Sequence, residues 1–194
     1  MSLDTHANDE LNAACAGWLQ DIARGNQTAL SEFYEATLGK CYALALRITR
    51  TRESAEEVVS DTFVQVWRDA ARFDGARGRP LAWLLSICRS RALDHLRQRD
   101  PAEPHEDPTL LNSERVVTWE DPLSLALAFE ANSVVHGAIA ALPKVSQQLL
   151  ALAFFKGMSH QEIADHTGMP LGTIKTHLRR AQAYLRTAVG EKLA

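Results

Sequence analysis

Apolar residues recur every three or four positions along most of the chain, and strand-like alternation is sustained nowhere. This pattern predicts an all-α fold. In the first half we expect four helices: one over residues 11–22, one capped by Thr28, one that opens with a capping box at residues 54–57, and one over residues 80–99 that starts at a proline. Residues 72–79 contain two glycines and are predicted to form the loop before the fourth helix.

The apolar stripes of these helices predict the core of the first half. Tyr34 and Trp67 fall on the stripes of the second and third helices, so they are expected to face inward. Cys15, Cys41 and Cys88 lie at or beside apolar positions, and their spacing matches neither a metal site nor a disulfide framework. We therefore expect three reduced thiols in or near the core. The seven histidines form no ligand cluster either, so no metal site is predicted.

The second half is predicted to be a smaller helical unit. Helical periodicity returns over residues 123–142, stops at a proline, and resumes over residues 146–156. Residues 159–162 form a capping box, and residues 167–170 combine a glycine suited to a left-handed conformation with a proline suited to a helix start. Another helix follows that proline. A short helix, a tight turn and a second helix together indicate a helix-turn-helix.

Residues 100–122, between the halves, carry several prolines, many carboxylates and few large apolar side chains. Such a segment cannot bury enough surface to order itself, so we expect a flexible acidic linker. The predicted domains are therefore residues 1–99 and residues 123–194, two small helical units joined by that linker.

The net charge of −3 conceals an alternation along the chain. Residues 1–67 carry 5 basic and 10 acidic side chains, and residues 100–143 carry 1 and 8. By contrast, residues 68–99 carry 8 basic and 3 acidic side chains, and residues 144–194 carry 7 and 3. Electrostatic attraction is screened over about 10 Å, so the two basic blocks can bind nucleic acid even on an acidic protein. The acidic blocks are expected to bind a protein partner, to form a solvated linker, or to suppress nonspecific DNA binding.

The last predicted helix sorts its side chains into two faces. Its apolar stripe consists of Ile174, Leu178, Ala181, Leu185 and Ala188. The opposite face carries Lys175, Thr176, Arg179 and Arg180. A basic helical face is often only a solvated surface. Here the cap, the turn and the sorted faces together match the geometry with which a helix enters a DNA major groove, so we predict DNA binding.

A second basic surface is predicted around the loop and the fourth helix of the first half. Arginines are frequent there, and Phe73 and Trp83 adjoin them. Aromatic rings beside cations suit single-stranded bases, because the ring offers a stacking face and the cation neutralises the backbone. Alternatively, Phe73 and Trp83 are core residues of a small helical lobe. The sequence leaves both interpretations open.

Taken together, these segments resemble bacterial RNA polymerase sigma factors of the extracytoplasmic-function (ECF) type, which retain only regions 2 and 4. The resemblance covers about residues 27–99 and 132–190. Region 2 is indicated by residues 29–34 (ALSEFY), 55–67 (AEEVVSDTFVQVW), 82–88 (AWLLSIC) and 92–97 (ALDHLR). Region 4 is indicated by residues 142–143 (LP), 159–164 (SHQEIA), 172–181 (GTIKTHLRRA) and 185–186 (LR). Many helix-turn-helix proteins share the region 4 segments, but few join them to the region 2 segments.

The resemblance implies a role for each surface. It implies that the third helix docks on the clamp helices of the polymerase β′ subunit through Glu57, Asp61 and Gln65. Region 2 is then expected to recognise and help to open the −10 element through Phe73, Asp74, Arg77, Arg79, Trp83, Arg89 and Arg97. Region 4 is expected to contact the β flap and to read the −35 element through Ser159, Thr173, Lys175, Thr176, His177, Arg179 and Arg180. Many relatives carry arginine at the position of His177, so a DNA contact there is expected to be weaker and to depend on pH.

The resemblance further implies control by an anti-sigma factor, and a linker that reaches toward the polymerase active-site cleft and RNA exit path. Our hypothesis from its charge is that the acidic linker mimics nucleic acid there. The rival hypothesis is a helix-turn-helix regulator that acts without polymerase and whose first lobe binds a ligand or dimerises. An enzyme is disfavoured, because the sequence shows no nucleophile and base pair and no phosphate loop; Asp94 and His95 are adjacent and point apart on a helix. No cofactor is predicted.

Membrane insertion is not expected either. The sequence has no apolar run of about 18 residues, and residues 1–12 are polar and acidic, unlike a signal peptide. We therefore expect a cytoplasmic protein.

Overall fold

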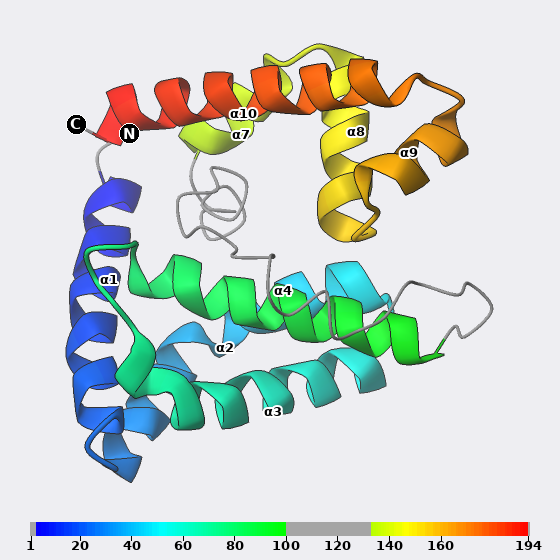
Figure 1. Ribbon diagram of the computed structural model, residues 1–194. Helices are drawn as coiled ribbons and strands as arrows, with labels where there is room; N and C mark the ends of the chain where they lie inside the picture. Colours follow the sequence, from blue (N-terminus) through cyan, green and yellow to red (C-terminus); the bar gives the residue numbers. More distant parts are fainter. Residues whose placement is uncertain (1–2, 100–132, 194) are drawn as a thin grey trace. The chain divides into compact units, whose positions relative to one another are not determined.

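The computed structural model describes residues 3–99 and 133–193, and all regular secondary structure in these residues is helical (Figure 1). The predicted all-α fold is thus confirmed. Contacts divide the chain into two compact units, one before and one after the gap, and each is described by itself. The predicted acidic linker, residues 100–122, and the first part of the helix predicted over residues 123–142 lie outside the described residues.

The N-terminal unit consists of α1 (Leu3–Ile22), α2 (Gln27–Thr49), α3 (Arg52–Asp69) and α4 (Pro80–Arg99), with a short 3₁₀ helix, η1 (Ala70–Arg72), after α3. α2 packs against α1, α3 and α4, and α3 also packs against α4. The largest fully buried side chains between them are Leu19, Ile22, Phe33, Val58, Val66, Leu81, Leu84 and Leu85. After η1, the chain runs alongside α1 to the start of α4, as Figure 1 shows.

The starts of α2 and α3 differ from the sequence expectation. Asn26 caps α2, because its Oδ1 accepts the N–H groups of Thr28 at 3.0 Å and Ala29 at 3.2 Å. Thr51 caps α3, because its Oγ1 accepts the N–H of Ser54 at 3.4 Å. Both expected caps, Thr28 and Ser54, therefore lie inside their helices. In each case an earlier polar side chain satisfies the first free N–H groups.

The three cysteines are buried and free, as the sequence predicts. Burial raises the pKa of the Cys15 thiol to about 12. A hydrogen bond with Cys88, together with burial, raises the pKa of Cys41 well above its ordinary value. Both thiols are therefore protonated and unreactive at neutral pH. Among the residues that the structure describes, no group of three or more His, Cys, Asp or Glu side chains is placed to hold a metal ion.

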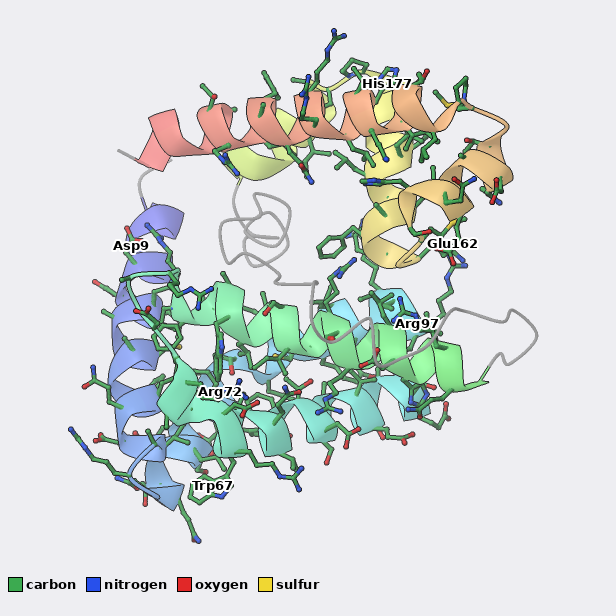
Figure 2. All side chains as sticks on the ribbon, in the orientation of Figure 1. Asp9, Trp67, Arg72, Arg97, Glu162 and His177 are labelled. Carbon is green, nitrogen blue, oxygen red and sulfur yellow. The ribbon has the colours of Figure 1, made fainter. Side chains whose placement is uncertain are left out.

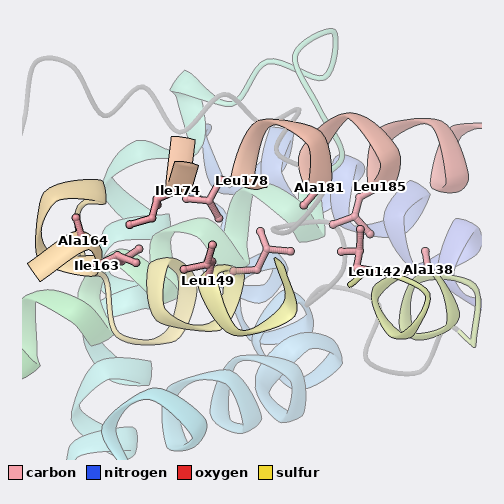
Figure 3. Packing of buried hydrophobic residues seen from close by; sticks show 10 residues of the cluster. Ala138, Leu142, Leu149, Ile163, Ala164, Ile174, Leu178, Ala181 and Leu185 are labelled. Atoms are coloured by element: carbon pink, nitrogen blue, oxygen red, sulfur yellow. The ribbon is translucent and has the colours of Figure 1, made fainter. Parts of the chain in front are cut away.

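The C-terminal unit consists of α7 (Ser133–Ala140), α8 (Lys144–Phe155), α9 (His160–Thr167) and α10 (Leu171–Leu193). α10 packs against the other three helices. The buried cluster that joins them, drawn in Figure 3, consists of Ala138, Leu142, Leu149, Leu150, Ile163, Ala164, Ile174, Leu178, Ala181 and Leu185. α8 begins at Lys144, directly after Pro143, whereas the sequence analysis placed its start at Ser146. Ser146 is instead buried within the helix.

Candidate nucleic-acid interfaces and docking groove

α9, the turn after it and the start of α10 form the predicted helix-turn-helix. The Oγ of Ser159 accepts the N–H of Glu162 at 3.2 Å, while the Glu162 carboxylate accepts the N–H of Ser159. Gly168 has a φ of 69° and closes α9, a left-handed conformation that suits glycine. The Pro170 carbonyl then accepts the N–H groups of Thr173 at 2.9 Å and Ile174 at 3.2 Å in the first turn of α10. These contacts confirm the predicted capping box and turn.

The two faces of α10 are separated as predicted. The stripe that packs on the cluster is at most 3% exposed and consists of Ile174, Leu178, Ala181 and Leu185. The polar side exposes Thr173, Lys175, Arg179 and Arg180. Thr176 lies on the same side and is half-buried; its hydroxyl donates to the Gly172 carbonyl at 2.8 Å. Three cations are therefore presented to solvent on one face of a helix that is anchored by its other face.

Ser159 and His177 have structural partners of their own within this unit. The Ser159 hydroxyl serves as the cap of α9. His177 is half-buried, and its Nδ1 lies 3.2 Å from the Oγ of Ser146, a buried residue of α8 (Figure 2). The imidazole of His177 thus links α10 to α8 and does not extend from the exposed cationic face.

Phe73, the first residue of the loop before α4, packs against Trp83 of α4. Phe73 and Trp83 pack edge to face, with ring centroids 5.6 Å apart. Trp83 is only 5% exposed, whereas Phe73 is half-buried. Trp83 therefore belongs to the core, the structural alternative considered above, and Phe73 is the member of the pair with exposed ring surface.

The loop also contains a turn that holds Asp74 and Arg77 at the surface. The Asp74 carboxylate accepts the N–H of Ala76 at 2.9 Å, and the Asp74 carbonyl accepts the N–H of Arg77 at 3.0 Å. Both Asp74 and Arg77 are exposed. A tight Asx-type turn of this kind presents Arg77 to solvent.

The other predicted cations of this surface differ in their surroundings. Arg79 is half-buried and donates to the Asp9 carboxylate at 2.7 Å. Arg97 pairs with Asp94 at 3.5 Å and its side chain is 28% exposed. Arg89 is half-buried on α4. Of the arginines predicted to contact the −10 element, Arg79 and Arg97 therefore already have carboxylate partners in the free protein.

The three residues predicted to dock on polymerase lie along α3. Asp61 is exposed, and the Glu57 side chain is 67% exposed, with its carboxylate 3.8 Å from Nδ1 of His95 on α4. Gln65 is half-buried: its Oε1 accepts from Nε of Arg91 on α4 at 2.7 Å. Glu57 and Asp61 are thus available to a partner, while Gln65 ties α3 to α4.

A groove between α2 and α3 was missed by the sequence analysis. Its volume is about 1090 Å³, and three of its apolar side chains are exposed: Tyr34 by 38%, Val64 by 46% and Trp67 by 37%. Phe63 is buried beside them and packs edge to face with Tyr34, their centroids 4.7 Å apart. The expectation that Tyr34 and Trp67 face inward is therefore wrong. Within this unit, no described helix covers that side of α2 and α3.

The sequence held one signal for this groove. Ser60, Val64 and Trp67 are spaced by four and three, so they share one helical face. Val64 lies about 180° around α3 from the centre of the buried stripe, among residues otherwise expected to face solvent. A single exposed apolar side chain is common, but Val64 and Trp67 on one face contribute to a contiguous apolar patch, the kind of surface that interaction sites use.

The chain matches two family models, Sigma-70 region 2 over residues 33–101 and Sigma-70, region 4 over residues 133–185. It is 31% identical to the ECF RNA polymerase sigma factor SigK of Mycobacterium tuberculosis (strain H37Rv) over 172 residues. The aligned segment covers 88% of this chain and 91% of SigK. The chain belongs to the ECF family of RNA polymerase sigma factors. This sigma factor is also 30% identical over 183 residues to SigK of Mycobacterium ulcerans, with 94% and 95% coverage. Among solved structures it is similar to CnrH in complex with the cytosolic domain of CnrY, at 21% identity and a TM-score of 0.41, with 92% and 98% coverage.

As an ECF sigma factor the protein is a transcription initiation factor and not an enzyme. The region 2 match begins at Phe33 and runs through α3 and α4, so it contains the basic loop and most of the groove. The region 4 match runs from Ser133 to Leu185 and contains the helix-turn-helix. α1 lies before the first match. In the described parts of this sigma factor, none of the helices is both long and apolar enough to span a membrane.

Proposed function

We propose that this sigma factor binds core RNA polymerase and directs initiation at promoters by recognising a −10 and a −35 element. The observation that carries the proposal is the exposed cationic face of α10, anchored by a buried stripe and joined in one chain to a region 2 lobe with its own basic surface. Residues 1–99 act as the region 2 domain and residues 123–194 as the region 4 domain.

The −35 element is read by α10 lying in the major groove. Lys175, Arg179 and Arg180 are exposed on the face away from the buried cluster, where they reach guanine edges or phosphates. Thr173 and Thr176 lie beside them. Ser159 and His177 contribute by holding α9 and α10 in place, because Ser159 caps α9 and His177 contacts Ser146 of α8.

The −10 element is captured by the loop before α4 and by α4 itself. Phe73 offers the stacking face for an unpaired base, and Trp83 supports Phe73 from the core. Arg77 and Arg79 follow Phe73 in the same loop, and Arg89 and Arg97 continue the basic surface along α4. Asp74 maintains the turn that presents Arg77.

Core polymerase docks on α3 and on the groove beside it. Glu57 and Asp61 supply carboxylates to the β′ clamp helices, and the exposed rims of Tyr34, Val64 and Trp67 supply apolar contact area. Gln65 acts indirectly, by fixing α3 to α4 through Arg91. The C-terminal unit contacts the β flap. The protein acts in the cytoplasm, because its polymerase partner and the promoter DNA are there.

An anti-sigma factor is the proposed regulator. The groove carries exposed apolar side chains in the free sigma factor, and an inhibitor that covers it excludes polymerase. Affinity purification of the tagged sigma factor from unstressed cells is expected to recover such an inhibitor. Recovery of polymerase alone would remove the support for this regulation.

The proposed function is tested by mixing the purified protein with core polymerase and a library of promoter fragments. We expect specific transcripts that core polymerase alone does not make. Tight binding to duplex DNA without polymerase, together with no transcript in its presence, would instead show a polymerase-independent helix-turn-helix regulator.

A further inference from the structure

α1 lies outside both family-model matches, yet it holds the segment that leads into α4. Asp9 contacts Arg79 across 70 positions of sequence, and Asn12 contacts Leu81 across 69. Asp9 and Asn12 are three residues apart and so share one face of α1. Figure 2 shows Asp9 on α1 beside the chain that runs to the start of α4.

The Asn12 contact fixes this arrangement. Asn12 is only 7% exposed, and its Oδ1 accepts the N–H of Leu81 at 3.3 Å. α4 begins at Pro80, which has no N–H, so Leu81 carries the first donor of the helix that needs a partner. The amide of Asn12 therefore caps α4 from a distant helix and sets the distance between α1 and the residue that precedes Pro80.

That preceding residue is Arg79, and its ion pair with Asp9 is short but accessible. Nη1 of Arg79 lies 2.7 Å from Oδ1 of Asp9, and the two side chains are 37% and 51% exposed. A charge-assisted hydrogen bond of this length is well formed. Because both groups are exposed to water, the pair contributes little net stability and is readily exchanged.

We infer that Asp9 is an autoinhibitory carboxylate: it occupies Arg79 in the free sigma factor and yields that guanidinium to a DNA phosphate in the promoter complex. The inference rests on the proposed contact between Arg79 and the −10 region. A carboxylate and a phosphate accept from the same planar guanidinium, so they compete for it directly. α1 thereby lowers the affinity of region 2 for DNA until promoter contacts displace Asp9.

The test measures how tightly the reconstituted holoenzyme binds a labelled promoter fragment that carries the −10 element, at one fixed salt concentration. Asp9→Asn keeps the size of the side chain and removes its charge. We expect the variant to bind about two- to fivefold more tightly, the range spanned by exposed ion pairs. Glu10→Gln is the matched control: Glu10 is also exposed but lies about 100° away around the helix, so affinity should stay unchanged.

A double-mutant cycle then assigns the effect to Arg79. Arg79→Ala is expected to weaken binding, and Asp9→Asn is expected to change nothing in the Arg79→Ala background. If Arg79→Ala leaves binding unchanged, the proposed −10 contact of Arg79 fails, and the inference fails with it. If Arg79→Ala weakens binding but Asp9→Asn does not strengthen it, the inference alone fails. An equal gain from Glu10→Gln, or a gain that persists without Arg79, overturns it as well, because the effect would then come from net charge.

Discussion

Replacing Trp67 with alanine removes the largest exposed side chain of the α2–α3 groove. Trp67 keeps 37% of its surface in the free protein. A tryptophan buries roughly 150–250 Å² when it is fully covered, so about 60–90 Å² remain for a partner to cover. At about 25 cal/mol per Å², this area is worth roughly 1.5–2.3 kcal/mol. If the groove is the polymerase surface, core polymerase should bind the variant roughly ten- to fiftyfold more weakly.

The assay is a titration of core polymerase into the labelled sigma factor, with affinity read from fluorescence anisotropy. Gln20→Ala is the control, because Gln20 is exposed on α1, outside the groove and outside the surfaces proposed to contact polymerase. Its affinity should change less than about twofold. Thermal unfolding of each variant shows whether any loss arises from misfolding.

A second groove variant tests whether loss of polymerase binding arises from misfolding. Val64 is 46% exposed and faces away from the core stripe of α3, so Val64→Asp should leave the fold intact while placing a carboxylate in an apolar interface. We expect it to weaken polymerase binding at least as much as Trp67→Ala. If both variants unfold at the same temperature as the wild type and bind core polymerase with the same affinity, the groove is not the docking surface.

Three further predictions concern particular side chains. Arg179→Ala removes an exposed cation of α10 and should weaken holoenzyme binding by roughly 1–3 kcal/mol at a promoter with a −35 element; an equal loss at a promoter without that element would contradict base recognition. Ser159→Ala removes the cap of α9 and should lower the free energy of unfolding by about 1 kcal/mol, measured by urea denaturation, whereas Ser159→Thr should retain most of it. Arg50 has a φ of 65°, so Arg50→Gly should raise the free energy of unfolding by about 0.5–1 kcal/mol. A lower urea midpoint for this variant would show that the arginine side chain itself stabilises α2.

Local signals predicted the parts of this fold that depend on neighbouring residues. The capping box at Ser159 and the left-handed Gly168 are set within a few positions of each other, and both were predicted from sequence. Where two polar residues competed to start a helix, the prediction chose the wrong one. Asn26 and Thr51 cap α2 and α3, because their side chains accept N–H groups that have no partner within the helix.

Contacts between residues far apart in the sequence could not be predicted from local sequence patterns. The resemblance implied DNA contacts for Arg79 and His177, but their partners Asp9 and Ser146 lie 70 and 31 residues away from them in sequence. Likewise, Trp67 fits a buried stripe of α3 by periodicity. Only the tertiary arrangement shows which side of α3 is left uncovered by the described helices of its unit. Helical pattern identifies an apolar face, but not whether this chain or another molecule buries it.

In the proposed function, two units of one sigma factor read two promoter elements at a spacing set by core polymerase. The most direct measurement is start-site mapping of transcripts that the reconstituted holoenzyme makes from a promoter with both elements, and from the same promoter with five base pairs inserted between them. This insertion turns one element about half a helical turn relative to the other. We predict one defined start on the first template and its loss on the second. Equal transcription from both templates, or from a template with either element alone, would contradict the account.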